Sequence, residues 1–77
     1  MTSNTVAGRF DAVDLAIVQA VGDRPRSFSD MPANVWEEAR KASPQRGHDR
    51  TVDARLQALR KRGLVAFKGG RWFIPTT

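Results

Sequence analysis

The chain has 77 residues, no cysteine and a formal net charge of +5 at neutral pH. This length accommodates one domain with a small core, and the lack of cysteine excludes disulfides and thiolate metal sites. No apolar run approaches membrane-spanning length, and the N-terminal residues lack the apolar core of a signal peptide. We therefore expect no membrane partner and a cytoplasmic location, associated with the nucleoid if the source is bacterial.

The positive charge is concentrated in the C-terminal half of the chain. Residues 1–43 carry five cations and six anions, a net charge of −1, whereas residues 44–77 carry eight cations and two anions, a net charge of +6. A polyanion such as nucleic acid is the natural partner of such a half. The alternative is a surface whose cations serve only solubility, and the uneven distribution argues against it.

The first elements are a tail and a helix. Residues 1–8 are small, polar and unpatterned, which predicts a disordered tail. A helix is predicted over 11–22, with Asp11 as its N-cap and Gly22 at its end. Apolar residues recur there at helical spacing, and we expect a buried face made of Val13, Ile17, Ala20 and Val21, widened by Leu15 and Val18.

A short strand at 27–28 and a second helix over 29–42 follow. Ser29 is the expected cap of this helix, and Pro32 is tolerated in its first turn. The residues at core spacing in this helix are Val35, Ala39 and Ala42, with Trp36 on the flank. Ser43 and Pro44 end it.

The period then changes from helical to alternating. A third helix is predicted over 48–62, with Val52, Leu56 and Leu59 facing the core and Gly63 just beyond its end. A hairpin is predicted over 64–74 around the dipeptide Gly69-Gly70. A two-residue loop pairs Lys68 with Arg71, Phe67 with Trp72 and Val65 with Ile74, and we expect the last two pairs to face the core.

The order helix, short strand, helix, helix, hairpin resembles the winged-helix family, a helix-turn-helix variant whose hairpin is called the wing. The segments that carry the resemblance are TVDARLQALRKRGLV at 51–65 and GGRWFI at 69–74. The resemblance implies an α+β fold: a small winged helix over 9–77, with a three-helix bundle, a short first strand and a C-terminal two-stranded wing. Members of this family mostly bind double-stranded DNA, and a minority bind proteins or RNA.

The outer side of the third helix has the chemistry of base reading. At about 100° per residue, Arg50, Ala54, Gln57 and Lys61 lie opposite the core residues, with Asp53 and Ala58 at the margins. Arginine pairs with guanine, glutamine with adenine, and an alanine methyl meets a thymine methyl. The family places this helix in the major groove. The predicted base readers are Arg50, Asp53, Ala54 and Gln57. The alternative is an ordinary solvated helix face. Asp53 equally fits a surface pair with Arg50 or Gln57.

Six cations and one threonine are expected to contact the DNA backbone. The candidates are Arg46, Thr51, Arg60, Lys61, Arg62, Lys68 and Arg71. Lys68 and Arg71 are neighbours of like charge across the hairpin, an arrangement that a phosphate between them would relieve. Solvent-screened tip cations are the alternative. We expect a small transcriptional regulator or a DNA-binding protein of a phage or mobile element.

Little in the sequence predicts catalysis or ligand binding. His48 and Asp49 lack the further histidine or cysteine that would complete a metal site, and no phosphate-binding loop motif occurs. We expect no enzyme activity, cofactor, metal or small-molecule ligand. The alternative function is a protein-interaction module acting as an adaptor in a larger nucleic-acid complex, or a homodimer, with Trp36 and Phe73 at the interface; core packing is the ordinary alternative for both residues.

Overall fold

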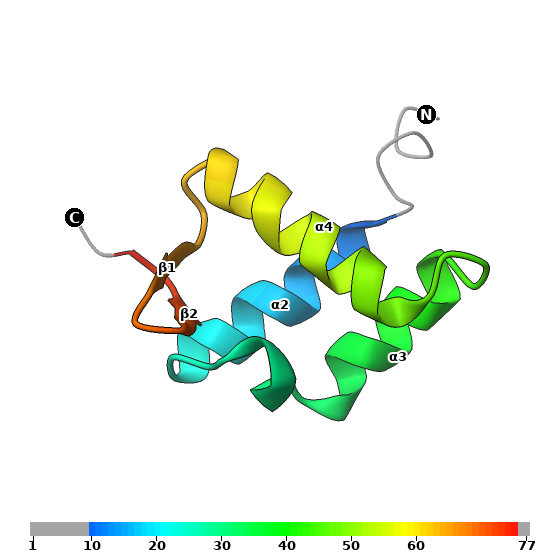
Figure 1. The fold of residues 1–77 in the computed structure, drawn as a ribbon, viewed down its shortest axis with the longest axis horizontal. Helices are drawn as coiled ribbons and strands as arrows, with labels where there is room; N and C mark the ends of the chain where they lie inside the picture. The colour runs from blue at the N-terminus through cyan, green and yellow to red at the C-terminus, as the bar shows by residue number, and fades with distance from the viewer. Residues whose placement is uncertain (1–9, 76–77) are drawn as a thin grey trace.

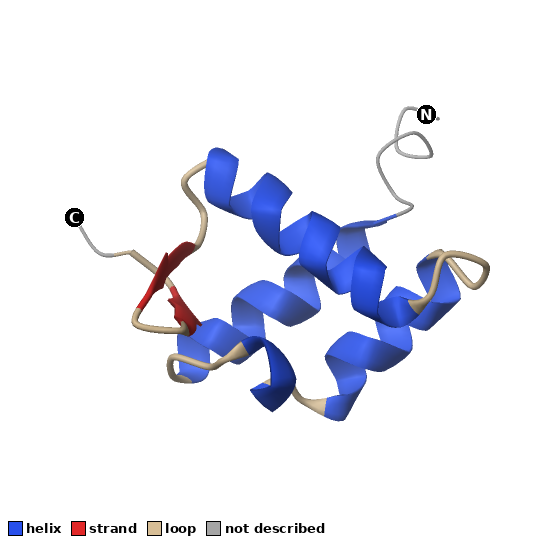
Figure 2. Ribbon diagram, in the orientation of Figure 1, coloured by secondary structure: helices blue, strands red, loops and turns tan. Residues whose placement is uncertain are grey.

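The computed structural model describes residues 10–75 and shows a small α+β fold. Three α-helices and one 3₁₀ helix precede a two-stranded antiparallel hairpin in this part of the chain (Figures 1 and 2). The elements are α2 (Asp11–Asp23), η2 (Phe28–Asp30), α3 (Ala33–Ala42), α4 (His48–Lys61), β1 (Ala66–Lys68) and β2 (Arg71–Phe73). The predicted tail at 1–8 lies outside the described residues.

Helix α2 buries the predicted face and differs from the prediction at its ends. The five buried residues are Val13, Ala16, Ile17, Ala20 and Val21. Leu15 is 58% exposed, because it lies about 200° around the helix from Val13 and so points away from the core. Phe10, not Asp11, occupies the N-cap position, and the helix continues past Gly22 to Asp23. Asp11 is therefore a first-turn residue, where its carboxylate still favours the helix dipole.

The predicted strand at 27–28 is wrong by position and by type. The pairing residue is Arg26, which exchanges backbone hydrogen bonds of 2.9 and 2.7 Å with Trp72 in a single antiparallel bridge. Phe28 instead begins η2, where the amide of Met31 donates to its carbonyl oxygen. The segment after α2 thus joins the hairpin through one residue and then turns.

The predicted helix over 29–42 begins four residues too early. Met31 is extended, with φ −65° and ψ 139°, as expected for a residue that precedes a proline. Pro32 is the N-cap residue of α3, so the helix begins at Ala33. Ser29 lies in η2 and caps no helix, which corrects the predicted start.

Helix α4 follows the prediction closely, ending at Lys61. Gly63, with φ 78°, adopts the left-handed conformation that favours glycine at this position. The amide of Gly63 donates to the carbonyl of Arg60, and the amide of Leu64 donates to the carbonyl of Leu59. This pair of bonds is a Schellman motif, which stops the helix and directs the chain into the hairpin.

The hairpin has the predicted loop and register but shorter strands. Lys68 pairs with Arg71 and Phe67 with Trp72, while Val65 and Ile74 lie beyond the ladder. Gly69 and Gly70 both have positive φ, as a two-residue turn of type I′ requires. Trp72 and Val65 are buried as predicted, and Ile74 packs against the core. Phe67 is 48% exposed, contrary to prediction: it packs on Trp72, with ring centroids 4.6 Å apart, and leaves part of its ring in solvent.

The three α-helices pack against one another around a single core. Its largest fully buried side chains are Ile17, Leu56, Leu59, Val13, Val35, Val52, Val65 and Thr51. The hairpin adjoins α2 at one end of the molecule, and the turn that leads into α4 lies at the opposite end (Figure 1). Helix α4 therefore runs between the hairpin and this turn.

Candidate nucleic-acid interface

Helix α4 presents the predicted outer stripe to solvent. Arg50, Ala54, Gln57 and Lys61 are exposed, as is Asp53, and Ala58 is half-buried. On the opposite side Val52, Leu56 and Leu59 are each at most 1% exposed. The packing of these three residues against the core thus fixes which side chains point outward, and all four predicted base readers are among them.

Thr51 does not belong to the interface. Its side chain is fully buried, and its hydroxyl donates a 3.1 Å hydrogen bond to the carbonyl oxygen of Gly47. The predicted contact between Thr51 and a phosphate is therefore wrong, because the hydroxyl is used inside the first turn of α4 and is closed to solvent.

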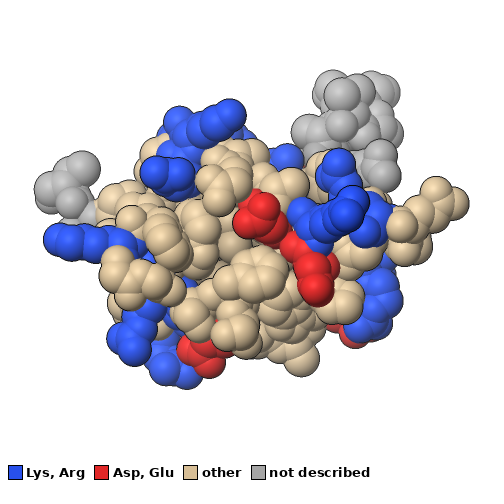
Figure 3. Space-filling model, viewed as in Figure 1, with Lys and Arg blue, Asp and Glu red and all other residues tan. Residues whose placement is uncertain are grey.

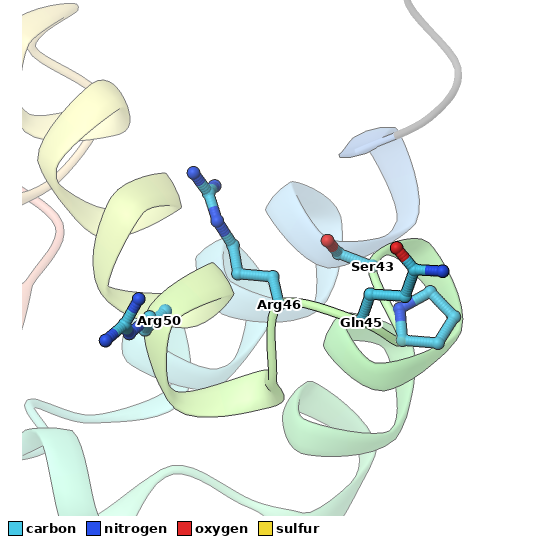
Figure 4. A pocket seen from close by; sticks show the side chains of 5 residues that line it. Ser43, Gln45, Arg46 and Arg50 are labelled. Atoms are coloured by element: carbon cyan, nitrogen blue, oxygen red, sulfur yellow. The ribbon is translucent and has the colours of Figure 1, made fainter.

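An open hollow that contains two arginines lies at the start of α4. It is lined by Ser43, Pro44, Gln45, Arg46 and Arg50. In Figure 4 the side chains of Arg46 and Arg50 extend away from the turn and the first turn of the helix. Gly47, with φ 98°, is the N-cap residue and supplies no side-chain cap. Backbone N–H groups at a helix start favour anions, so both arginines lie beside a region of positive potential.

The cations of the described chain fall into two sets. The first set forms ion pairs with carboxylates at 4.0 Å or less: Arg24, Arg26, Arg40, Lys41 and Arg55. The second set is exposed and has no carboxylate partner among residues 10–75: Arg46, Arg50, Arg60, Lys61, Arg62, Lys68 and Arg71. We call this second set the unpaired cations. They are the same seven cations that the sequence assigned to DNA.

Acidic side chains interrupt the basic surface. Asp49 and Asp53 are the exposed carboxylates of α4, and Figure 3 shows acidic side chains between basic groups that lie over the two ends of this helix. Asp49 lies 3.0 Å from Nε2 of His48. Asp53 forms no ion pair with Arg50 in the described chain, and Gln57 accepts a hydrogen bond from Arg60 at 3.4 Å instead. The surface pairing of Asp53 with Arg50 or Gln57 is therefore not formed.

At the tip of the hairpin two like charges face each other. Lys68 and Arg71 are directly paired in the register, and both are exposed. Like charges directly opposed across strands are unfavourable, and an anion between them would lower that repulsion. The tip is therefore a point at which the molecule gains from contact with a phosphate.

The two aromatic candidates for a protein interface are both half-buried. Nε1 of Trp36 donates a 2.9 Å hydrogen bond to the carbonyl of Met31. Its ring packs edge-on against Phe28 and His48, each with centroids 5.3 Å apart. Phe73 lies in β2 opposite Ala66. The contacts of Trp36 are those of a packing residue at the junction of η2, α3 and α4.

One structural pair was missed by sequence reasoning. Arg55 binds Asp14 through two hydrogen bonds of 2.8 Å, and its guanidinium lies 5.0 Å from the ring centroid of Phe10. Hydrogen bonding of Arg55 to the carboxylate of Asp14 is the largest cause that raises the pKa of Arg55; burial opposes it, and the fields of Asp14 and Asp11 add to the rise. No spacing rule reveals this pair, because the partners are 41 positions apart.

Other kinds of site find no support in residues 10–75. No group of three or more histidines, cysteines or carboxylates is placed to hold a metal ion. No helix in this range is long and apolar enough to cross a membrane. Comparison of the chain with protein-family models, curated proteins and solved structures finds no match. The function must therefore be argued from this chain's own residues.

Proposed function

We propose that this protein binds double-stranded DNA, with α4 in the major groove and the hairpin against the backbone, as a winged-helix module. The observation that carries the proposal is the set of seven unpaired cations on α4, the turn before it and the hairpin. Carboxylates pair with five other cations of the described chain, so the cations that keep an uncompensated charge there are those of α4, the turn before it and the hairpin. A polyanion complements these unpaired cations.

The outer stripe of α4 supports reading of bases. A helix of 14 residues is about 21 Å long, and its width suits the major groove. In this arrangement Arg50 donates to guanine, Gln57 pairs with adenine, and Ala54 lets the helix approach the bases closely. Asp53 accepts a hydrogen bond from a cytosine amino group, which offsets the unfavourable field of a carboxylate near phosphates.

The remaining cations support contact with the backbone at both ends of the helix. Arg46 lies beside the N-terminus of α4, Arg60 to Arg62 lie at its C-terminus, and Lys68 and Arg71 lie at the hairpin tip. The cellular role that fits is a cytoplasmic transcriptional regulator or a DNA-binding protein of a phage or mobile element. The alternative, an adaptor that contacts proteins, depends on Trp36 and Phe73, and both are half-buried.

The test is the salt dependence of binding to duplex DNA, with two variants that change net charge equally. If about five unpaired cations contact phosphates, log affinity against log salt has a slope of about −4 to −5. Lys61→Gln removes an unpaired cation and should reduce that slope by about one. Arg40→Gln removes a cation paired with Glu37 at 3.2 Å and should leave the slope unchanged.

Fluorescence anisotropy across a salt series measures these slopes. Equal effects of the two variants would show that net charge, not this surface, drives binding. A flat salt dependence, or no binding at low salt, would reject the DNA proposal and favour the adaptor.

A further inference from the structure

The hairpin exposes an aromatic ring at the register position next to its two tip cations. Phe67 is 48% exposed and directly precedes Lys68, whose partner across the turn is Arg71. One side of the ring is held in place, because its centroid lies 4.6 Å from that of Trp72 at an interplanar angle of 48°. Trp72 is buried and bridged to Arg26 by two backbone hydrogen bonds. Phe67 is thus a fixed ring with an open surface.

Charge decides what kind of partner fits this ring. The cations nearest in sequence, from Arg60 to Arg71, have no carboxylate partner in the described chain. An apolar surface of another protein would have to desolvate these cations without compensating them. A nucleic acid offers phosphates to the cations and the flat face of a base to the ring, so it complements both features.

The position of Phe67 in the hairpin favours stacking on an unpaired base over stacking on a paired one. Lys68 and the two glycines separate the ring from the tip, so the ring does not lead the hairpin into a base step. Separating stacked base pairs also costs about as much free energy as stacking one base on an aromatic ring returns. An unpaired base is already separated from its partner and retains the full gain.

We propose that Phe67 stacks on an unpaired base that lies next to the duplex bound by α4. The inference rests on the proposed function and makes it narrower: the preferred partner is DNA at a junction between double and single strands, rather than uninterrupted duplex. The tip cations hold the backbone of the departing strand, and the ring holds its first unpaired base.

The experiment compares three DNAs that share one duplex sequence. The first is blunt, the second carries a short single-stranded overhang, and the third carries the same overhang without bases. The third DNA keeps the added phosphates and removes only the stacking partner. Wild-type protein should bind the overhang with bases about tenfold more tightly than the overhang without bases, which is the lower part of the range for stacking one base.

Variants at one position separate stacking from packing. Phe67→Leu keeps apolar cover on Trp72 and removes the aromatic face, so the tenfold ratio should fall to about one. Phe67→Tyr keeps the aromatic face and should keep the ratio. Lys68→Ala should weaken the two overhang complexes by a similar factor and so leave their ratio unchanged, because both overhangs carry the same phosphates. In the wild-type complex, fluorescence of 2-aminopurine at the first unpaired position should be quenched.

Each outcome bears on a distinct claim. A ratio of one in the wild type, or an unquenched 2-aminopurine, overturns the inference while binding of the blunt duplex keeps the proposed function. A ratio that Phe67→Leu leaves at ten also overturns it. If circular dichroism shows that Phe67→Leu is unfolded, the inference is decided by the affinity ratio of Phe67→Tyr and by the quenching of 2-aminopurine. No binding to any of the DNAs rejects the proposed function itself.

Discussion

Arg55 differs from the other cations of α4 because the fold itself uses it. Its guanidinium forms two hydrogen bonds with the carboxylate of Asp14 in α2, and the two side chains are only 22% and 18% exposed. A planar guanidinium and a carboxylate fit each other in this two-bonded geometry. The pair therefore joins α4 to α2 at one defined rotation, which keeps the outer stripe pointing away from the core.

Removal of one partner should be costly. Asp14→Asn leaves Arg55 partly buried without a counter-ion, and we expect a loss of about 2 kcal/mol in the free energy of unfolding. In a domain of this size that corresponds to a fall of about 10 °C in melting temperature. The control is Glu38→Gln, whose partner Lys41 lies 3.8 Å away and is largely exposed, so its loss should be under about 0.5 kcal/mol. Equal melting temperatures for the two variants would refute this role.

The pH dependence of the Arg55 contribution follows from the direction of its shift. The pKa of Arg55 is raised in the folded state, chiefly because its guanidinium donates hydrogen bonds to the carboxylate of Asp14. Stabilisation from a raised pKa is fully present below the unfolded value and is lost as pH rises through the folded value. For arginine that range lies far above neutrality, so this contribution is constant across neutral and mildly alkaline pH.

At the scale of residues, the sequence predicts which cations are exposed better than it predicts which residues they contact. It assigned seven cations to a surface, and those seven are exposed and unpaired in the described chain. The assignment of Thr51 is wrong, because the sequence does not show whether a threonine hydroxyl faces solvent or hydrogen-bonds to the backbone. Here it donates to the carbonyl of Gly47. Sequence reasoning missed the pair of Asp14 and Arg55, because only the packing of α2 on α4 brings the two together.

At the scale of elements, local signals decided how much was predictable. The end of α4 was predictable from Gly63, whose positive φ permits the Schellman motif, and the hairpin register from the Gly-Gly loop. The predicted start of α3 is wrong, because Pro32 precedes the helix as its N-cap residue and keeps Met31 in an extended conformation. The predicted burial of Phe67 is wrong although its cross-strand neighbour Trp72 is buried, because burial of one member of a pair does not determine the cover of the other.

The two basic elements should contribute differently to DNA binding. Arg50→Ala removes a base contact from α4 and should cost about 1–3 kcal/mol on the preferred site and much less on unrelated DNA. Lys68→Ala removes a backbone contact from the hairpin, should weaken all sequences similarly and should reduce the salt slope by about one. Both side chains are exposed, so melting temperatures should change little. Anisotropy titrations on a selected site and on a scrambled duplex measure the difference.

Equal losses for Arg50→Ala on the two duplexes would contradict the assignment of α4 as the reading helix. The protein would then be a general nucleic-acid binder, or it would read sequence with another surface.

At the scale of the molecule, the core was largely predictable and the arrangement of the linking segment was not. Helical spacing identified the buried residues of α2 and α4, because each helix has one continuous apolar stripe. Residues 24–32 lack such a pattern, and their conformation depends on tertiary contacts: the bridge from Arg26 to Trp72 and the packing of Phe28 on Trp36. Segments that are organised by distant partners carry little local signal.

The choice between a packed monomer and a protein-binding module depends on Trp36. Its ring contacts Phe28 and His48 and its indole nitrogen is bonded to the carbonyl of Met31, so it connects η2, α3 and the start of α4. Trp36→Ala should therefore lower the free energy of unfolding by about 2–4 kcal/mol. Trp36→Phe keeps a ring and loses the hydrogen bond, so it should cost about 1 kcal/mol beyond the difference in packing. Chemical denaturation and sedimentation velocity separate the two roles. If Trp36→Ala converts a dimer into a stable, folded monomer, the tryptophan belongs to a protein interface. If the variant unfolds without a prior change of mass, the tryptophan stabilises the domain.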